Sequence, residues 1–422
     1  MNINPQQFLN QETKAIIWQV VLDYREKRRK ALLKSGLEYE NFREELYQIK
    51  KKTISQIENL KKKVIEALKE NGINVFEAKD VTQAREIVQS LTKDDQIILK
   101  SKSNIADEID LKPVFAGKEL VETDLGDIIN QWMAEEDLHP VFPAFHLTPE
   151  QIVEKIYQKF GQKIEPKAEA IADFARQYLR KKISQATVGI TGTNATTADG
   201  RIILLENEGN ISLVSRWPDK HIIISGIEKL VFDLETGMKI VKASAIWGAG
   251  QDWPVYVSII SGPSKTADIQ NKLVIGAQGA KEVYLILVDN GRTKLLEEGF
   301  GEILYCINCG ACLNFCPVFH QIARNYGDKY LGSKGVIFAG LSENYQKAVE
   351  ANCFACTLCS ACFENCPVKI DLPRLMKKLR SFMEKENLQT KENQEMIEKI
   401  RQFGNPFGKL EEGKIPKKLY CC

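Results

Sequence analysis

The sequence CINCGACLNFCP at residues 306–317 recurs as CTLCSACFENCP at residues 356–367. Each stretch has the spacing C-x2-C-x2-C-x3-C-P, which binds [4Fe–4S] clusters in bacterial two-cluster ferredoxins. Three thiolates at three-residue steps wrap one corner of a cubane, and the fourth cysteine binds the other cluster. We therefore expect two [4Fe–4S] clusters. The expected ligands are Cys306, Cys309, Cys312 and Cys366 for cluster one, and Cys316, Cys356, Cys359 and Cys362 for cluster two.

Two alternatives to this ligand assignment arise from the same residues. Paired C-x2-C also binds zinc, but four staggered cysteines in each run exceed what one tetrahedral ion needs. Cys353, three residues before Cys356, opens a second register for the later run. Only the register that begins at Cys356 ends in a Cys-Pro pair, as the first run does. We therefore treat Cys353 as a spare, inert thiol.

Composition and cysteine distribution narrow the class of protein. The chain has 422 residues, which at about 150 residues per domain indicates two to three domains. Its 58 Lys and Arg nearly balance 56 Asp and Glu, so charge gives no reason to expect nucleic-acid binding. No apolar run approaches the ~18 residues of a membrane span, and the N-terminus does not resemble a secretory signal. Nine of the 11 cysteines fall between Cys306 and Cys366, which favours metal binding in a reducing cytoplasm.

Apolar periodicity divides the rest of the chain. Steps of three and four from Ile54 to Leu68 predict a helical segment over residues 1–72. Short β-branched runs alternate with helical stretches over residues 73–300, which predicts an α/β sheet covered by helices. Residues 301–385 hold the clusters, and residues 386–422 form a polar tail. The expected strands are 73–76, 96–100, 188–191, 201–206, 221–226, 254–261 and 282–288, and the expected helices include 82–91, 125–135 and 148–160.

Loops that follow several of these strands are rich in Gly and Asn: TGTN at 191–194, ENEGN at 206–210 and SGPSKTAD at 261–268. Ligands of open α/β sheets bind beyond the carboxyl ends of the strands, although such residues also simply form turns. We treat both interpretations as open. If a small-molecule site is present, its expected residues are Lys100, Ser101, Asn194, Glu206, Asn207, Gly209 and Asp268.

The chain resembles the iron–sulfur proteins of bacterial lactate utilisation, in which a LUD domain precedes a two-cluster ferredoxin module. The resemblance runs from about residue 20 to 380, and its second cysteine run has Cys356 where family members often have serine. The segments that carry it are KSKSNIADEI (100–109), LVETDLGDII (120–129), FPAFHLTPEQI (142–152), ITGTNATTADGRIILLENEGN (190–210), GIEKLV (226–231), LVDNGRTKLL (287–296) and CINCGACLNFCPVF (306–319).

The resemblance implies a sheet like that of the ribose-phosphate isomerase and CoA-transferase superfamily, with a mainly helical ferredoxin module and N-terminal helices. It also implies oxidation of L-lactate to pyruvate together with a cysteine-rich iron–sulfur protein and a second LUD protein. The sequence shows no flavin, haem or nucleotide motif, so we expect an electron-transfer subunit. Two alternatives are a subunit of another dehydrogenase or heterodisulfide-reductase-like complex, and a metabolite-binding or catalytic LUD module whose clusters sense redox state.

Overall fold

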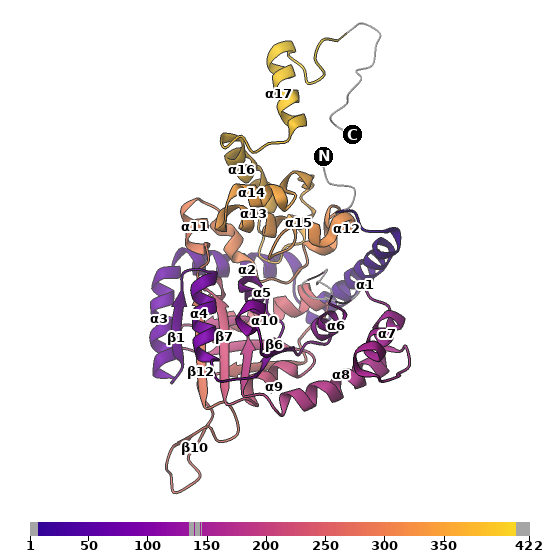
Figure 1. The fold of residues 1–422 in the computed structure, drawn as a ribbon. Coiled ribbons are helices and arrows are strands. Elements are labelled where there is room, and N and C mark those ends of the chain that lie inside the picture. The colour runs from indigo at the N-terminus through magenta and orange to yellow at the C-terminus, as the bar shows by residue number, and fades with distance from the viewer. Residues whose placement is uncertain (1–6, 135–138, 140–143, 145, 411–422) are drawn as a thin grey trace.

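The structure is a computed structural model, which describes residues 7–134, 139, 144 and 146–410 (Figure 1). It begins with three helices, α1 (Gln11–Ser35), α2 (Tyr39–Ser55) and α3 (Ile57–Glu70). The apolar positions expected to form one face of α3, from Ile57 to Leu68, are buried. The N-terminal helical segment therefore packs through the face that its periodicity predicts.

A six-stranded parallel sheet is the centre of the α/β domain, in the order β1-β12-β7-β4-β2-β3. Its neighbours pair in parallel throughout. Both faces of a fully parallel sheet are usually covered. Accordingly, alternate side chains of β7 belong to different apolar cores: Ile222 and Ile224 lie in one core, and Ile223 lies in the other. The strands are β1 (Asn74–Ala78), β2 (Ile97–Lys100), β3 (Glu119–Glu122), β4 (Val188–Thr191), β7 (Lys220–Gly226) and β12 (Glu282–Val288).

A smaller sheet in the order β8-β5-β6-β9 packs beside the first, and a two-stranded hairpin, β10-β11, projects from the α/β domain (Figure 1). The apolar side chains of Ile269, Leu273 and Ile275 on this hairpin are exposed. The strands are β5 (Ala195–Thr197), β6 (Ile202–Glu206), β8 (Leu230–Val231), β9 (Tyr256–Ile260), β10 (Lys265–Thr266) and β11 (Val274–Ile275).

Helices connect and cover these strands, which confirms the predicted α/β class. Each expected strand is present, with bounds shifted by at most two residues, and the predicted helix 125–135 ends at Met133 because Ala134 adopts a left-handed conformation. Glu135 lies outside the described residues. The helices are α4 (Val81–Leu91), α5 (Asn104–Ile109), α6 (Leu125–Met133), α7 (Pro149–Phe160), α8 (Ala168–Ile183), α9 (Asn210–Arg216), α10 (Leu234–Ser244) and α11 (Arg292–Glu297).

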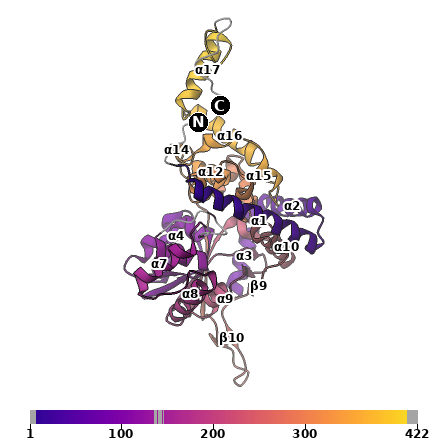
Figure 2. The same cartoon turned by 90° about the vertical axis from the view of Figure 1, so that its right-hand side faces the viewer.

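The ferredoxin module, residues 301–385, lies on the α/β domain beside α1, as Figure 2 shows. One apolar core joins all three parts of the chain: it contains Leu60 of α3, Leu287 of β12 and Leu375 of the module. No helix in the described part of the chain is long and apolar enough to cross a membrane. The helices here are α12 (Phe319–Ile322), α13 (Gly332–Ser342), α14 (Tyr345–Glu350), α15 (Ala361–Glu364) and α16 (Leu372–Lys385), followed by α17 (Lys391–Phe403).

Candidate iron–sulfur centre and adjoining cavity

The two cysteine runs form loops with the same backbone conformation. Cys306 and Cys356 each follow a short 3-10 turn, with φ, ψ values of −61°, 125° and −60°, 120°. The second and fourth residues after each are left-handed: Asn308 and Gly310 in the first loop, and their counterparts 358 and 360 in the second. Left-handed backbone is unfavourable for leucine, which occupies position 358, so the repeated turn is a built feature of both loops.

The four cysteines expected to bind cluster one lie together. Burial raises the pKa of Cys312, and neighbouring thiols raise it further, including Cys306, Cys309 and Cys366. The pKa of Cys366, on the far run, is about 12 because of burial and the approach of Cys306. The fourth cysteine of the second run therefore approaches the first loop, and its assignment to cluster one stays a prediction.

The four cysteines expected to bind cluster two form a second group. Burial raises the pKa of Cys362 to about 12, and the neighbouring thiols add to it: Cys316, Cys356 and Cys359. Cys362 also acts electrostatically on Cys312, so the two groups adjoin. The described residues contain no group of three or more His, Cys, Asp or Glu side chains that could hold a metal ion. In a cubane each thiolate binds a different iron atom, so its four ligands need not converge on one point.

Backbone amides support these sulfur atoms. Amide groups donate to Sγ of Cys306 at 3.3 Å, and to Sγ of Cys316 and Cys366 at 3.4 Å each. Hydrogen bonds of this kind stabilise thiolates and tune cluster potentials. The residues present therefore fit two [4Fe–4S] clusters, in both thiolate grouping and donor supply.

Cations gather around cluster one. The Cys306 thiol acts electrostatically on the amines of Lys50 and Lys229, and Lys334 donates to Asn308 beside that thiol. Burial lowers the pKa of Lys50 to about 8, and its ammonium donates to the Glu228 carbonyl at 2.6 Å. Positive charge stabilises the reduced, more negative state of a cluster.

Cluster two is the more accessible of the two sites. Cys359 is exposed, whereas Cys309 and Cys366 of the other set are buried. Arg380 donates to the carbonyl oxygens of Cys353 and Cys356 at 2.6 and 2.8 Å, which fixes the start of the second loop. The cysteines expected to bind cluster two therefore reach the surface of the molecule.

Cys353 lies in the apolar core at the start of the second loop. Its side chain is fully buried, with Sγ 3.8 Å from the Met383 sulfur. Burial raises its pKa to about 12. These surroundings agree with the expectation of a spare thiol. Cys421 and Cys422 lie outside the described residues.

A cavity of about 570 Å³ lies between the α/β domain and the first cysteine loop. Its walls include Ser101 after β2 and Gly192–Asn194 after β4, and Ile307–Cys309 of the ferredoxin module. β2 and β4 are neighbours in the sheet, but the chain continues from them in opposite directions, to β3 and β7. The cavity therefore occupies a switch point of strand order, where α/β sheets bind ligands.

Four of the seven predicted ligand residues line this cavity: Ser101, Asn194, Glu206 and Asn207. Three of them also hold neighbouring backbone. Asn194 Oδ1 accepts from the Leu205 amide at 2.8 Å, Asn207 Oδ1 from the Val255 amide at 3.1 Å, and Glu206 from the Ser212 amide at 2.9 Å. These side chains therefore shape the wall as well as face the cavity.

The other three predicted residues are not cavity-lining. Lys100 is buried at the end of β2, and its ammonium lies 2.8 Å from Asp107 and 3.0 Å from Glu122. Gly209 only caps α9. Asp268 accepts from Thr266 within the projecting hairpin, because SGPSKTAD leads out of the smaller sheet instead of turning back over the main one.

The sequence interpretation missed several cavity residues. Lys229 lines the cavity from a short turn after β7, and Lys102 and Glu208 line it from loops that the prediction crossed without naming them. The pKa of Glu208 is raised to about 7 by burial and by the Asp124 carboxylate. The segment GIEKLV could have indicated Lys229, because it follows β7, and β7 ends at the same edge of the sheet as β2 and β4.

A buried charge network joins the two domains at the edge of this site. The Arg292 guanidinium contacts Glu108 at 2.8 Å and Glu228 at 2.5 Å, and Tyr330 of the ferredoxin module donates to Glu108. Burial alone would raise the pKa of Glu228, but the Arg292 charge outweighs it and lowers that pKa to about 2. Tyr330 and Phe338 of the module contact this network.

The chain has four histidines. His139, His221 and His320 are buried, and burial lowers their pKa values to about 3, 3 and 4. His221 Nε2 and Thr191 Oγ1 are 2.9 Å apart within the sheet. His146 is half-buried. None of the four is a cavity-lining residue.

Residues 61–288 match the LUD domain family, and residues 302–370 match the 4Fe-4S dicluster domain family. Together, the fold and the cysteine loops define an iron–sulfur protein in which a LUD domain precedes a two-cluster ferredoxin module, with two [4Fe–4S] clusters as its cofactors. The chain is 35% identical over 356 residues to lactate utilization protein B of Bacillus pumilus, covering 82% of this chain and 73% of that protein. The chain belongs to the lactate utilization protein B family.

A second relative belongs to the same family. Lactate utilization protein B of a Geobacillus species is 35% identical over 344 residues, with 80% of this chain and 70% of that protein covered. A solved DUF162 family protein from Deinococcus radiodurans covers 55% of this chain, at 10% identity and a TM-score of 0.31. That structural similarity is too low to support an argument.

Proposed function

We propose that the chain is the electron-transfer subunit of a cytoplasmic complex that oxidises L-lactate to pyruvate. Its relatives are named for lactate utilisation, and its chain matches them through both the LUD domain and the ferredoxin module. The proposed partners are a cysteine-rich iron–sulfur protein and a second LUD protein. When bound, each [4Fe–4S] cluster takes up and returns one electron.

One observation carries this proposal: the two sets of ligand cysteines adjoin, and one set is more exposed to solvent than the other. Cys309 lines the internal cavity, Cys312 adjoins Cys362, and Cys359 is exposed. The ligand residues therefore follow a continuous course from the cavity beside the LUD domain to the surface of the ferredoxin module. Such an arrangement suits passage of electrons between an internal donor site and an external protein.

The surface of the chain supports membership of a complex. The projecting β10-β11 hairpin exposes more than half of Ile269 and Leu273 and nearly half of Ile275. Contiguous exposed apolar side chains are typical of protein–protein interaction sites.

The test is anaerobic purification of the chain with its native partners, followed by a screen of electron donors. L-lactate should bleach the visible absorption of the clusters, and D-lactate should do so far more slowly. The matched control is the Cys359→Ser complex, whose second cluster loses a ligand at the exposed corner. Failure of L-lactate to reduce clusters that dithionite reduces would overturn the proposal, and reduction by a dithiol donor alone would support the heterodisulfide-reductase-like alternative.

A further inference from the structure

The cavity at the switch point is a space in its own right and not the chamber of cluster one. Of the eight expected ligand cysteines, only Cys309 is among its lining residues. Its volume of about 570 Å³ falls in the range of small-molecule sites. It is bounded by the α/β domain on one side and by residues 307–309 of the cluster loop on the other.

Buried polar atoms in its wall lack partners. Ser101 is fully buried, and its Oγ has no hydrogen-bond partner in the described structure. Ser244 Oγ and Gln251 Oε1, from two half-buried lining residues, are also buried atoms without a hydrogen-bond partner among the described residues. Buried polar atoms are normally hydrogen-bonded, so these three indicate a polar occupant of the cavity.

The acidic side chains of the cavity are already engaged. Glu206 accepts hydrogen bonds from both the amide and the hydroxyl of Ser212, and Glu208 accepts from the Leu125 amide at 3.1 Å. Asp124 caps α6 and lies 3.7 Å from the Lys102 ammonium. Their negative charge is therefore partly compensated before any ligand enters.

Lys229 differs from the neighbouring lysines. Lys50 donates to the Glu228 carbonyl and Lys334 to the Asn308 side chain, whereas no hydrogen bond or ion pair within 4.0 Å is recorded for the Lys229 ammonium among the described residues. The backbone turn after β7 brings Lys229 to the wall of the cavity. Glu228 and the Cys306 thiol act on this ammonium only from beyond ion-pair distance, so a ligand carboxylate in the cavity can make the direct contact.

We propose that this cavity binds a small organic carboxylate, with Lys229 as the counter-charge and Ser101 as a hydrogen-bonding residue, beside the loop of cluster one. The inference deepens the proposed function and rests on it for the choice of ligand, since L-lactate and pyruvate both carry a carboxylate and a second oxygen function. A neutral amide of the same shape cannot form an ion pair with the Lys229 ammonium.

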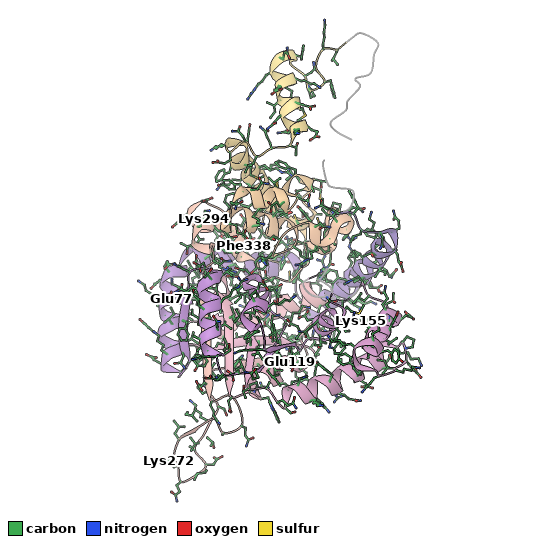
Figure 3. The ribbon with its side chains drawn as sticks, in the orientation of Figure 1. Glu77, Glu119, Lys155, Lys272, Lys294 and Phe338 are labelled. Carbon is green, nitrogen blue, oxygen red and sulfur yellow. The ribbon has the colours of Figure 1, made fainter. Side chains whose placement is uncertain are left out.

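The test is calorimetric titration of the anaerobic holoprotein with L-lactate, pyruvate and lactamide. Lys229→Gln should weaken binding of both carboxylates at least tenfold, and lactamide should bind weakly to wild type and variant alike. The matched control is Lys272→Gln, whose lysine lies on the projecting hairpin (Figure 3) and whose loss should leave affinity unchanged. Iron content and circular dichroism of each variant check that the fold and both clusters are retained.

A second variant keeps the test decisive if Lys229→Gln fails to fold. Ser101→Ala removes one hydroxyl and should weaken carboxylate binding several-fold. Binding of neither acid to the wild type, or wild-type affinity in Lys229→Gln, would overturn the inference. If lactate still reduces the clusters in Lys229→Gln, the proposed function stands and the role of Lys229 is wrong. If carboxylates bind but lactate does not reduce the clusters, the cavity inference stands and the proposed function is wrong.

Discussion

At the residue scale, Cys356 is the predicted first ligand of the second cysteine run. The left-handed residues two and four positions after Cys306 recur after Cys356 and not after Cys353. Cys356→Ser should therefore convert cluster two towards a [3Fe–4S] species, because one of its four thiolates is lost. Cys353→Ser should leave both clusters intact. Electron paramagnetic resonance of the two variants measures this, and loss of cluster two in the Cys353 variant alone would mean that the register is wrong.

The charge of Lys50 should tune cluster one. Its ammonium is fully buried and near the Cys306 thiol, so Lys50→Met should disfavour the reduced cluster and lower its midpoint potential, on the order of tens of millivolts. A redox titration followed by electron paramagnetic resonance measures the shift. Lys265→Met, on the exposed hairpin, serves as the control and should leave the potential unchanged. An unaltered potential in Lys50→Met would show that this charge does not act on the cluster.

Residue-level prediction succeeded where one local pattern carried the information. The repeated cysteine spacing predicted two loops of the same conformation, and Ser101 and Asn194, which line the cavity, follow their strands directly. Lys50 and Lys229 lie 179 residues apart in the sequence, and only the packing of α2 against the turn after β7 brings both near Cys306. No local pattern could have predicted that pairing.

At the scale of elements, buried strands were the most predictable part of the fold. β7 and β12 are runs of β-branched and aliphatic residues because both faces of the sheet are covered. β5 and β8 have only three and two residues, so neither gives a periodic signal. The sequence also did not predict that SGPSKTAD enters a projecting hairpin. Its turn-forming residues are equally compatible with a loop that turns back over the main sheet.

The Arg292 network links the two domains through Tyr330 and Phe338 of the ferredoxin module, while both of its ion pairs lie within the α/β domain. Arg292→Met leaves Glu108 and Glu228 buried without their cation, so we expect the free energy of unfolding to fall by about 3–5 kcal/mol. Chemical denaturation of the holoprotein, followed by circular dichroism, measures this. A change below about 1 kcal/mol would contradict it.

The same link predicts a pH dependence. The pKa of Glu228 is lowered to about 2 from an unfolded value of about 4.3, so its stabilising contribution is present above pH 4.3 and is lost as pH falls towards 2. In Arg292→Met the unpaired carboxylates take up protons more readily. The stability difference between wild type and variant should therefore shrink as pH falls through this range, and a difference that grows would contradict the assignment.

At the scale of the whole molecule, the N-terminal helices, the LUD domain and the ferredoxin module share one apolar core. Separate sequence patterns predicted the three parts, but not that they pack as one body. The shared core keeps the cavity, cluster one and cluster two in fixed order, which electron transfer requires.

Two complete cysteine runs predict the metal content of the whole chain. Anaerobically purified protein should be brown and contain about eight iron and eight sulfide per chain. Iron and acid-labile sulfide assays measure this, with zinc determined in the same samples. A result of two zinc ions and no sulfide per chain would show that the cysteines bind zinc and not iron–sulfur clusters.

The most direct test of the proposed function is freeze-quench electron paramagnetic resonance of the anaerobic complex after mixing with L-lactate. Each lactate releases two electrons on oxidation to pyruvate, and the two clusters of one chain accept one electron each. We predict signals of both reduced clusters, integrating to about two spins per chain, that appear no more slowly than catalytic turnover. Clusters that stay oxidised with L-lactate, yet become reduced with dithionite in the same samples, would contradict the proposed role.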